Sequence, residues 1–182
     1  HRVDRRQRQM CIRDRACKLK GAKTVICCDI SDSSLERSKQ FGADYTVNSK
    51  TQDIVAEVQK ITNGHGCTVA FDSACFPGSL TMIMQPGIVC NAGRVVPMGF
   101  CTVPEKITQQ MINGRELTIC GTRMSLNQWV PTAQKMAEGK YHMEGLATTF
   151  VKFSEIEKVF DNIVHPDPAV KKTVILFDGA ED

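Results

Sequence analysis

Short apolar runs alternate with helix-like patterns along most of this chain, and this alternation constrains the fold more than any other feature. Residues 24–28 form an apolar run after Gly21, which favours a buried parallel strand. Residues 31–34 can cap the helix that residues 35–41 predict, and Gly42 closes it. Because strand and helix alternate in steps of about 20–25 residues, we expect an α/β fold with a doubly wound parallel sheet.

The same pattern continues toward the end of the chain. Apolar residues recur at helical spacing between positions 53 and 61, and Asn63-Gly64 closes that segment. We predict further helices and strands from the remaining runs: helices at 78–84, 126–137 and 153–163, and strands at 45–47, 68–71, within 87–96, at 117–120 and at 171–177.

Size and composition agree with one globular domain. The chain has 182 residues, of which 42% are hydrophobic and 24% charged. No apolar run approaches the roughly 18 residues that cross a membrane, and the Arg-rich start lacks the apolar part of a secretory signal. The nine cysteines include no C-x-x-C pair, so they predict reduced, mostly buried thiols. We therefore expect a cytoplasmic protein without a membrane partner.

The positive charge is confined to the start of the chain. The formal net charge is +3, but residues 1–15 hold six arginines and two aspartates. The remaining residues carry 17 basic and 18 acidic side chains, so their net charge is −1. A nearly neutral body predicts no nucleic-acid partner. A binding module that uses residues 1–15 as a basic arm stays open as an alternative, and deletion of that arm would abolish its salt-sensitive binding.

Asp29 is a candidate binding residue because it ends the predicted strand at 24–28. In dinucleotide-binding folds, a carboxylate at this place accepts hydrogen bonds from the ribose hydroxyls of adenosine. It also repels the additional phosphate of NADP, so it favours NAD as the cofactor. One alternative is a carboxylate that only caps the following helix or loop. Another is a methyltransferase, a class that also carries an acid after its second strand.

The glycine-rich turn that should accompany such an acid is missing. Its pattern, G-x-G-x-x-G, belongs after the first strand and roughly 20 residues before Asp29. No glycine precedes Gly21, so that region encodes no backbone cradle for a pyrophosphate. We therefore expect a sheet that lacks its first, central strand. The strands at 24–28 and 68–71 would then have unpaired edges.

Several segments, taken in order, resemble the zinc-type medium-chain alcohol and polyol dehydrogenases. Residues 16–22 (ACKLKGA) resemble the end of the first Rossmann helix of that family, and residues 24–44 resemble its second strand, helix and G-A-D turn. The run GRVVPMG at 93–99 is similar to the nicotinamide-side strand, and RELTICGT at 115–122 to the next strand and loop. The match covers about residues 16–178 and implies a Rossmann-type sheet of the sorbitol, threonine or sugar-acid dehydrogenase kind.

The resemblance implies an NAD-dependent oxidoreductase that transfers hydride between a secondary alcohol and NAD. It places the catalytic residues and the zinc ligands in a separate domain that this chain lacks. We therefore expect no metal site and no activity from the chain alone. The intact enzyme would act on a small-molecule alcohol as a homo-oligomer. The cofactor-binding residues that the resemblance implies are Asp29, Ile30, Ser73, Ala74, Cys75, Met98, Gly99, Phe100, Cys120, Gly121 and Thr122.

We expect three segments along the chain. Residues 1–15 resemble no part of the family and look like translated sequencing-adapter sequence, so we expect an artefactual or disordered segment. Residues 16–145 would form the NAD-binding Rossmann domain, and residues 146–182 would return toward the absent catalytic domain. One departure from the family is Ser34, which stands where members often carry Lys or Arg five positions after the ribose acid.

Overall fold

The computed structural model describes residues 12–74, 76–123, 127–141, 145, 147, 149–165, 167, 170 and 172–177. The strands are β1 (Ile26–Asp29), β2 (Tyr45–Asn48), β3 (Cys67–Asp72), β4 (Val89–Pro97), β5 (Thr118–Ile119), β6 (Thr149–Lys152) and β7 (Thr173–Leu176). Residues 12–19 are also helical. The later helices are α2 (Asp32–Gln40), α3 (Ile54–Ile61), α4 (Ser79–Ile83), α5 (Gln109–Asn113), α6 (Trp129–Ala137), the 3₁₀ helix η1 (Phe153–Glu155) and α7 (Ile156–Val164).

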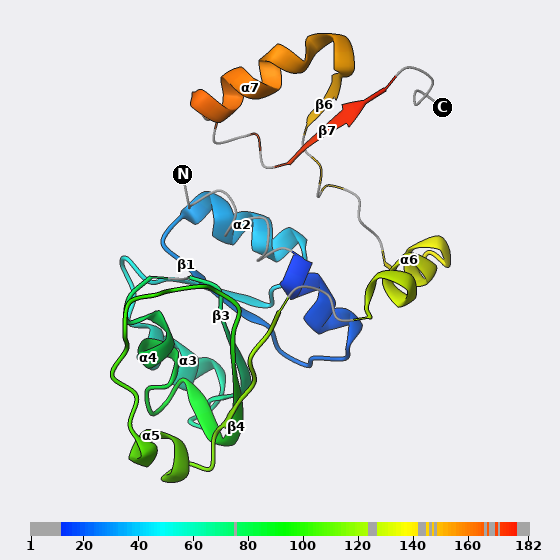
Figure 1. The fold of residues 1–182 in the computed structure, drawn as a ribbon. Coiled ribbons are helices and arrows are strands. Elements are labelled where there is room, and N and C mark those ends of the chain that lie inside the picture. The colour runs from blue at the N-terminus through cyan, green and yellow to red at the C-terminus, as the bar shows by residue number, and fades with distance from the viewer. Residues whose placement is uncertain are drawn as a thin grey trace.

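The strands pair in parallel, as the alternation of strand and helix predicts (Figure 1). β1 pairs with β2, from Ile26 opposite Tyr45 to Asp29 opposite Asn48. β4 lies between β3 and β5, and β6 pairs with β7. Parallel pairs require crossover connections, which the helices provide. The predicted α/β, Rossmann-type architecture is confirmed.

The sheet is divided at the place where the sequence lacks a central strand. Among the described residues, β1 pairs with β2 alone and β3 with β4 alone. Residues 12–14 are helical and therefore do not replace the strand. Burial first, and then the nearby thiol of Cys67, raise the pKa of Cys28, at the end of β1, to about 12.

The larger core packs helices onto the β3–β4–β5 sheet. Its buried members are Met84, Ile88, Val89, Val95 and Leu117. Side chains of α3 and α4 pack against them, and both helices lie beside β3 and β4 in Figure 1. Nε2 of Gln59 on α3 donates to the carbonyl of Gly87 at 2.6 Å. Because α3 follows β2, this contact anchors the β1–β2 part of the chain to the larger sheet.

A smaller core lies between α2, β1 and the helical residues 12–19. It contains Cys27, Leu35 and Ala43. Asp14 is buried at its margin with 7% of its surface exposed, and its Oδ2 has no hydrogen-bond partner in the described part of the chain. Burial raises the pKa of Asp14 to about 6, although hydrogen bonding from Ser38 and the charge of Arg13 oppose this. An ionised carboxylate at this place destabilises the fold, because the surroundings favour the neutral, protonated form.

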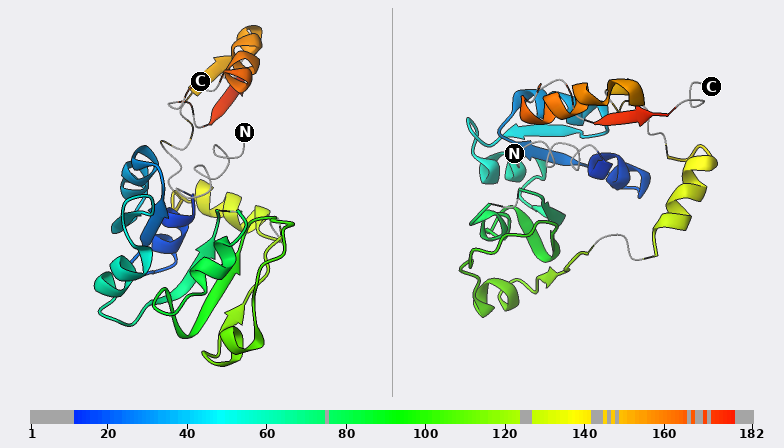
Figure 2. Two further views of the ribbon diagram at one scale, coloured as in Figure 1. Left: turned by 90° about the vertical axis from the view of Figure 1, so that its left-hand side faces the viewer. Right: turned by 45° about the horizontal axis from the view of Figure 1, so that its top comes forward.

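β6, η1, α7 and β7 form a separate unit at the C-terminal end of the described chain (Figures 1 and 2). The rings of Phe153 and Phe177 stack there with centroids 5.1 Å apart. The sequence predicted the helix and the last strand but missed β6, which has four residues. α7 leaves Phe160, Ile163 and Val164 exposed. Large apolar side chains exposed together on one helix are typical of a surface that packs against other protein.

Candidate functional site

Three loops begin at one edge of the β3–β4–β5 sheet, because these parallel strands end side by side. Asp72 at the end of β3 pairs with Pro97 at the end of β4, and Val95 pairs with Ile119 at the end of β5. In open parallel α/β sheets, ligands bind at this carboxyl edge. The structure brings most of the predicted cofactor residues to this edge: Ser73, Ala74, Met98, Gly99, Phe100, Cys120, Gly121 and Thr122. Cys75, also predicted, lies outside the described residues.

Hydrogen bonds fix the start of each loop. The backbone N–H of Met98 donates to the carbonyl of Asp72 at 2.9 Å, and that of Cys120 donates to the carbonyl of Val95 at 2.9 Å. Oγ1 of Thr122 donates to the carbonyl of Pro97 at 2.9 Å. Beyond these anchors, Phe100 is 69% exposed. The edge therefore combines hydrogen-bonded backbone with the largely exposed ring of Phe100, and the guanidinium carbon of Arg123 lies 5.0 Å from the centre of that ring.

Asp29 ends β1 in the neighbouring sheet, and its carboxylate takes the loop-capping role that the sequence left open as an alternative. Its Oδ1 accepts a hydrogen bond from the backbone N–H of Ser31 at 2.8 Å, which shapes the loop before α2. Its Oδ2 accepts no hydrogen bond from the part of the chain that the structure describes. The residue is half-buried, and the next side chain, Ile30, is 65% exposed. One carboxylate oxygen therefore organises the loop while the other is available to a ligand.

The basic residue that the family often carries near this acid is not replaced by Ser34 or Arg37 on α2. Ser34 takes its position and is buried on the inner face of α2. Arg37, one turn further along, donates to the carbonyl of Gly145 at 2.6 Å and lies 5.4 Å from the ring of Phe41. Its guanidinium group therefore serves packing between α2 and Gly145.

Two carboxylates that organise the edge were missed from the sequence. Asp72 is buried, and it accepts hydrogen bonds from the N–H of Ala74 at 3.0 Å and from Oγ of Ser79 at 2.8 Å. Its position after a strand, like that of Asp29, was a usable signal. Glu105 binds Thr81 from a loop 24 residues away, and nothing local in the sequence marks it.

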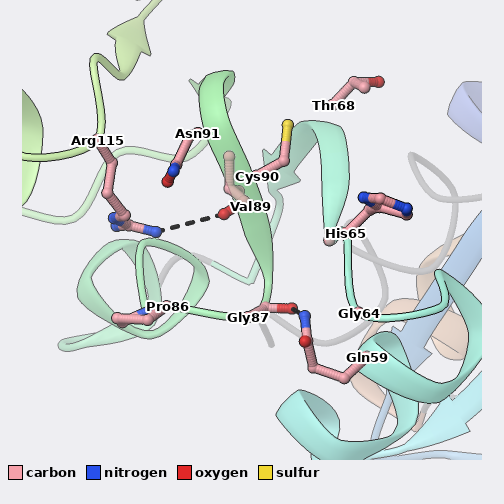
Figure 3. A pocket seen from close by; sticks show the side chains of 11 residues that line it. Gln59, Gly64, His65, Thr68, Pro86, Gly87, Val89, Cys90, Asn91 and Arg115 are labelled. Atoms are coloured by element: carbon pink, nitrogen blue, oxygen red, sulfur yellow. Dashed lines mark hydrogen bonds between the residues drawn. The ribbon is translucent and has the colours of Figure 1, made fainter.

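A cavity of about 600 Å³ opens at the other end of the strands, near the start of β3 and β4 (Figure 3). It contains none of the predicted cofactor residues. Arg115 lines it and donates to the carbonyls of Met84 and Val89, the latter at 3.3 Å. Because Met84 is the C-cap of α4, the guanidinium group satisfies carbonyls at that helix end. Arg115, at the border of this cavity, therefore has a structural role as the cap of α4.

No metal centre is found in the described ranges, where no three His, Cys, Asp or Glu side chains are grouped to hold an ion. His65 and His165 are exposed, and His142 lies outside these ranges. None of the described helices combines the length and apolarity that a membrane crossing requires.

Comparison with known proteins identifies the class to which this site belongs. A family profile described as zinc-binding dehydrogenase matches residues 15–138. The chain therefore belongs to the zinc-binding dehydrogenase family. The resemblance predicted from about residue 16 onward is confirmed, and so is the fold it implied.

Individual relatives agree with this assignment. The chain is 33% identical to an L-threonine 3-dehydrogenase of Pyrococcus horikoshii over 150 residues, which cover 79% of this chain and 42% of that protein. It is 32% identical to the starvation-sensing protein RspB of Escherichia coli K12 over 141 residues, covering 76% of this chain and 40% of that protein. The chain spans less than half the length of the curated relatives it matches.

A solved structure supports the same fold assignment. An alcohol dehydrogenase (rspB) from Escherichia coli CFT073, complexed with the cofactor NADH, superposes with a TM-score of 0.77 and 27% sequence identity. The alignment covers 90% of this chain and 48% of that one. The aligned part therefore shares its fold with a protein that holds a dinucleotide.

Proposed function

We propose that this chain is the cofactor-binding part of an NAD-dependent, zinc-type alcohol or polyol dehydrogenase. The observation that carries the proposal is the carboxyl edge, where loops 73–74, 98–100 and 120–122 start together. Asp29, with one carboxylate oxygen available, ends the adjoining sheet. The NADH held by the rspB dehydrogenase supports this cofactor.

The described residues suit two parts of the dinucleotide. Oδ2 of Asp29 would accept a hydrogen bond from a ribose hydroxyl, and its charge would repel a 2′-phosphate. The loops at 98–100 and 120–122 would orient the nicotinamide end through their backbone groups. NAD would supply the hydride acceptor, while the polypeptide supplies position and excludes water.

The pyrophosphate is not provided for by the described residues. A cradle for it needs backbone N–H groups at a glycine-rich helix start. The helical segment at 12–19 contains no glycine, and it buries Asp14 instead. We expect the chain to bind the cofactor weakly for this reason.

The division into segments also remains a proposal. Residues 16–145 would form most of the cofactor domain, and residues 12–15 would belong to it as well, because they begin the helix that buries Asp14 beside the smaller core. Residues 146–182 would pack against a catalytic domain outside this chain. The exposed apolar side chains of α7 support such packing. The zinc ligands and the pocket for a small alcohol would also lie in that domain, and the intact enzyme would be a cytoplasmic homo-oligomer.

Titration with NADH, NADPH and S-adenosylmethionine tests the cofactor. We expect NADH to bind at least about tenfold more tightly than NADPH, and Asp29→Asn to weaken NADH by about tenfold, the value of one charged hydrogen bond. Glu36→Gln is the matched control, because Glu36 is exposed on α2 and pairs with Lys39. Preferential binding of S-adenosylmethionine, or unchanged NADH affinity in Asp29→Asn, would contradict the proposal.

A further inference from the structure

The loop after β4 crosses from the carboxyl edge to α5 without regular structure. Residues 98–108 form this crossing, and they begin with the predicted nicotinamide-side residues. The N–H of Met98 holds the start of the loop to the carbonyl of Asp72. Of the described residues between 99 and 107, Glu105 is the one whose side chain hydrogen-bonds to another element. The far part of the crossing is therefore held by this carboxylate and by Ile107, which packs against the larger core.

Glu105 provides a side-chain cap for the N-terminus of α4. The N-cap of α4 is Gly78, which has no side chain to accept a hydrogen bond. Oε2 of Glu105 accepts hydrogen bonds from the N–H of Thr81 at 2.8 Å and from its Oγ1 at 2.9 Å. Partial desolvation opposes ionisation, but these hydrogen bonds, with others from Leu80 and Gly78, lower the pKa of Glu105. The loop thus provides the charged cap that α4 needs.

The same helix turn is held from the other side by Asp72. Its carboxylate binds Ser79 and Ala74, while its carbonyl binds the N–H of Met98. α4 therefore lies between two carboxylates, one at the end of β3 and one on the loop after β4. The carboxylates of Asp72 and Glu105 therefore connect both loops, at 73–74 and after β4, to α4.

We infer that Glu105 is a positioning residue: its carboxylate, acting through Thr81, sets the separation between the loop at 73–74 and the loop at 98–100. This inference rests on the proposed function, because these loops would receive the adenosine and nicotinamide sides of the cofactor. Glu105 itself does not touch the cofactor. Removing its carboxylate frees the loop at 98–104 and leaves the strands in place.

Hydrogen–deuterium exchange without any ligand tests the positioning role. In Glu105→Ala, protection of the Thr81 amide in α4 and of the Met98 amide at the start of the loop falls by about tenfold or more, the equivalent of one charged hydrogen bond. Protection in β3 and β4 stays unchanged. Glu105→Gln gives an intermediate loss, since its amide oxygen accepts hydrogen bonds without the charge. Glu138→Ala is the control, because Glu138 is exposed and pairs with Lys140 beyond α6.

Two results would overturn the inference: unchanged protection of the Thr81 and Met98 amides, or an equal loss of protection throughout the sheet. A second measurement separates this inference from the proposed function. Glu105→Ala weakens NADH by about tenfold and leaves AMP affinity unchanged, because AMP lacks the nicotinamide end. If the unaltered chain binds no NADH, the proposed function fails, while the exchange data still decide the role of Glu105.

Discussion

Nζ of Lys18 lies 2.6 Å from Oδ2 of Asp44, and the same oxygen accepts a hydrogen bond from the backbone N–H of Val25 at 2.7 Å. One carboxylate thus joins the helical residues 12–19, the start of β1 and the turn before β2. The turn is the G-A-D sequence at 42–44 that the resemblance singled out.

Asp44→Asn should destabilise the domain by about 1 kcal/mol, a small value because the ion pair is partly exposed and screened by solvent. The hydrogen bond from Lys18 is the main cause that lowers the pKa of Asp44. The stabilisation of the folded state by this ion pair is therefore complete at neutral pH, and it is lost as the pH falls through the lowered pKa of Asp44. Urea unfolding at pH 7 and pH 3 measures it. Equal stability of both proteins at pH 7 would contradict the prediction.

Asp14 should give the opposite dependence on pH. Burial raises the pKa of Asp14 from 3.8 to about 6. The stability that the protonated side chain gives the folded state is therefore complete below pH 4 and is lost as the pH rises through 6. The shift corresponds to about 3 kcal/mol of unfolding free energy. Asp14→Asn should remove this slope and stabilise the chain at pH 7. Asp161→Asn, on the exposed side of α7, is the control; a parallel slope in Asp14→Asn and the unaltered chain would refute the effect.

Gly93 and Gly121 should respond differently to alanine. A Cβ at Gly93 would lie 2.4 Å from Cγ1 of Val89 and 2.7 Å from the carbonyl oxygen of Cys90, so backbone would have to move. Gly93→Ala should cost about 1–3 kcal/mol. A Cβ at Gly121 meets nothing within 4 Å, so Gly121→Ala should leave thermal stability unchanged. It should weaken NADH if the cofactor approaches that backbone closely, whereas a large loss of stability in Gly121→Ala would show a structural need for glycine.

The isolated chain should not oxidise alcohols. No group of metal ligands occurs in the described ranges, and zinc-dependent dehydrogenation requires a metal to lower the pKa of the alcohol. Incubation with NAD, zinc and sorbitol, threonine or butanediol should produce no NADH by absorbance. Measurable NADH formation above a heat-denatured control would overturn this expectation.

Local patterns predicted most elements because each signal lies within a few residues. The helix predicted from 53 to 61 is α3, and Asp53 caps it through the N–H of Ala56. α5 (QQMIN) and β6 (TFVK) were missed because each holds two apolar residues beside polar ones and forms no distinct apolar run. Such elements depend on neighbours that the sequence does not order in space.

The sequence by itself determined the alternation of strands and helices, the acid at the end of β1 and the lack of a glycine-rich turn. These features depend on residue type and spacing along one stretch of chain. Only the tertiary structure decided that residues 12–19 form a helix and do not replace the missing strand, that Asp14 is buried, and that Glu105 caps α4. Each of these outcomes depends on groups far apart in the chain, whose hydrogen bonds and burial exist only after folding brings them together.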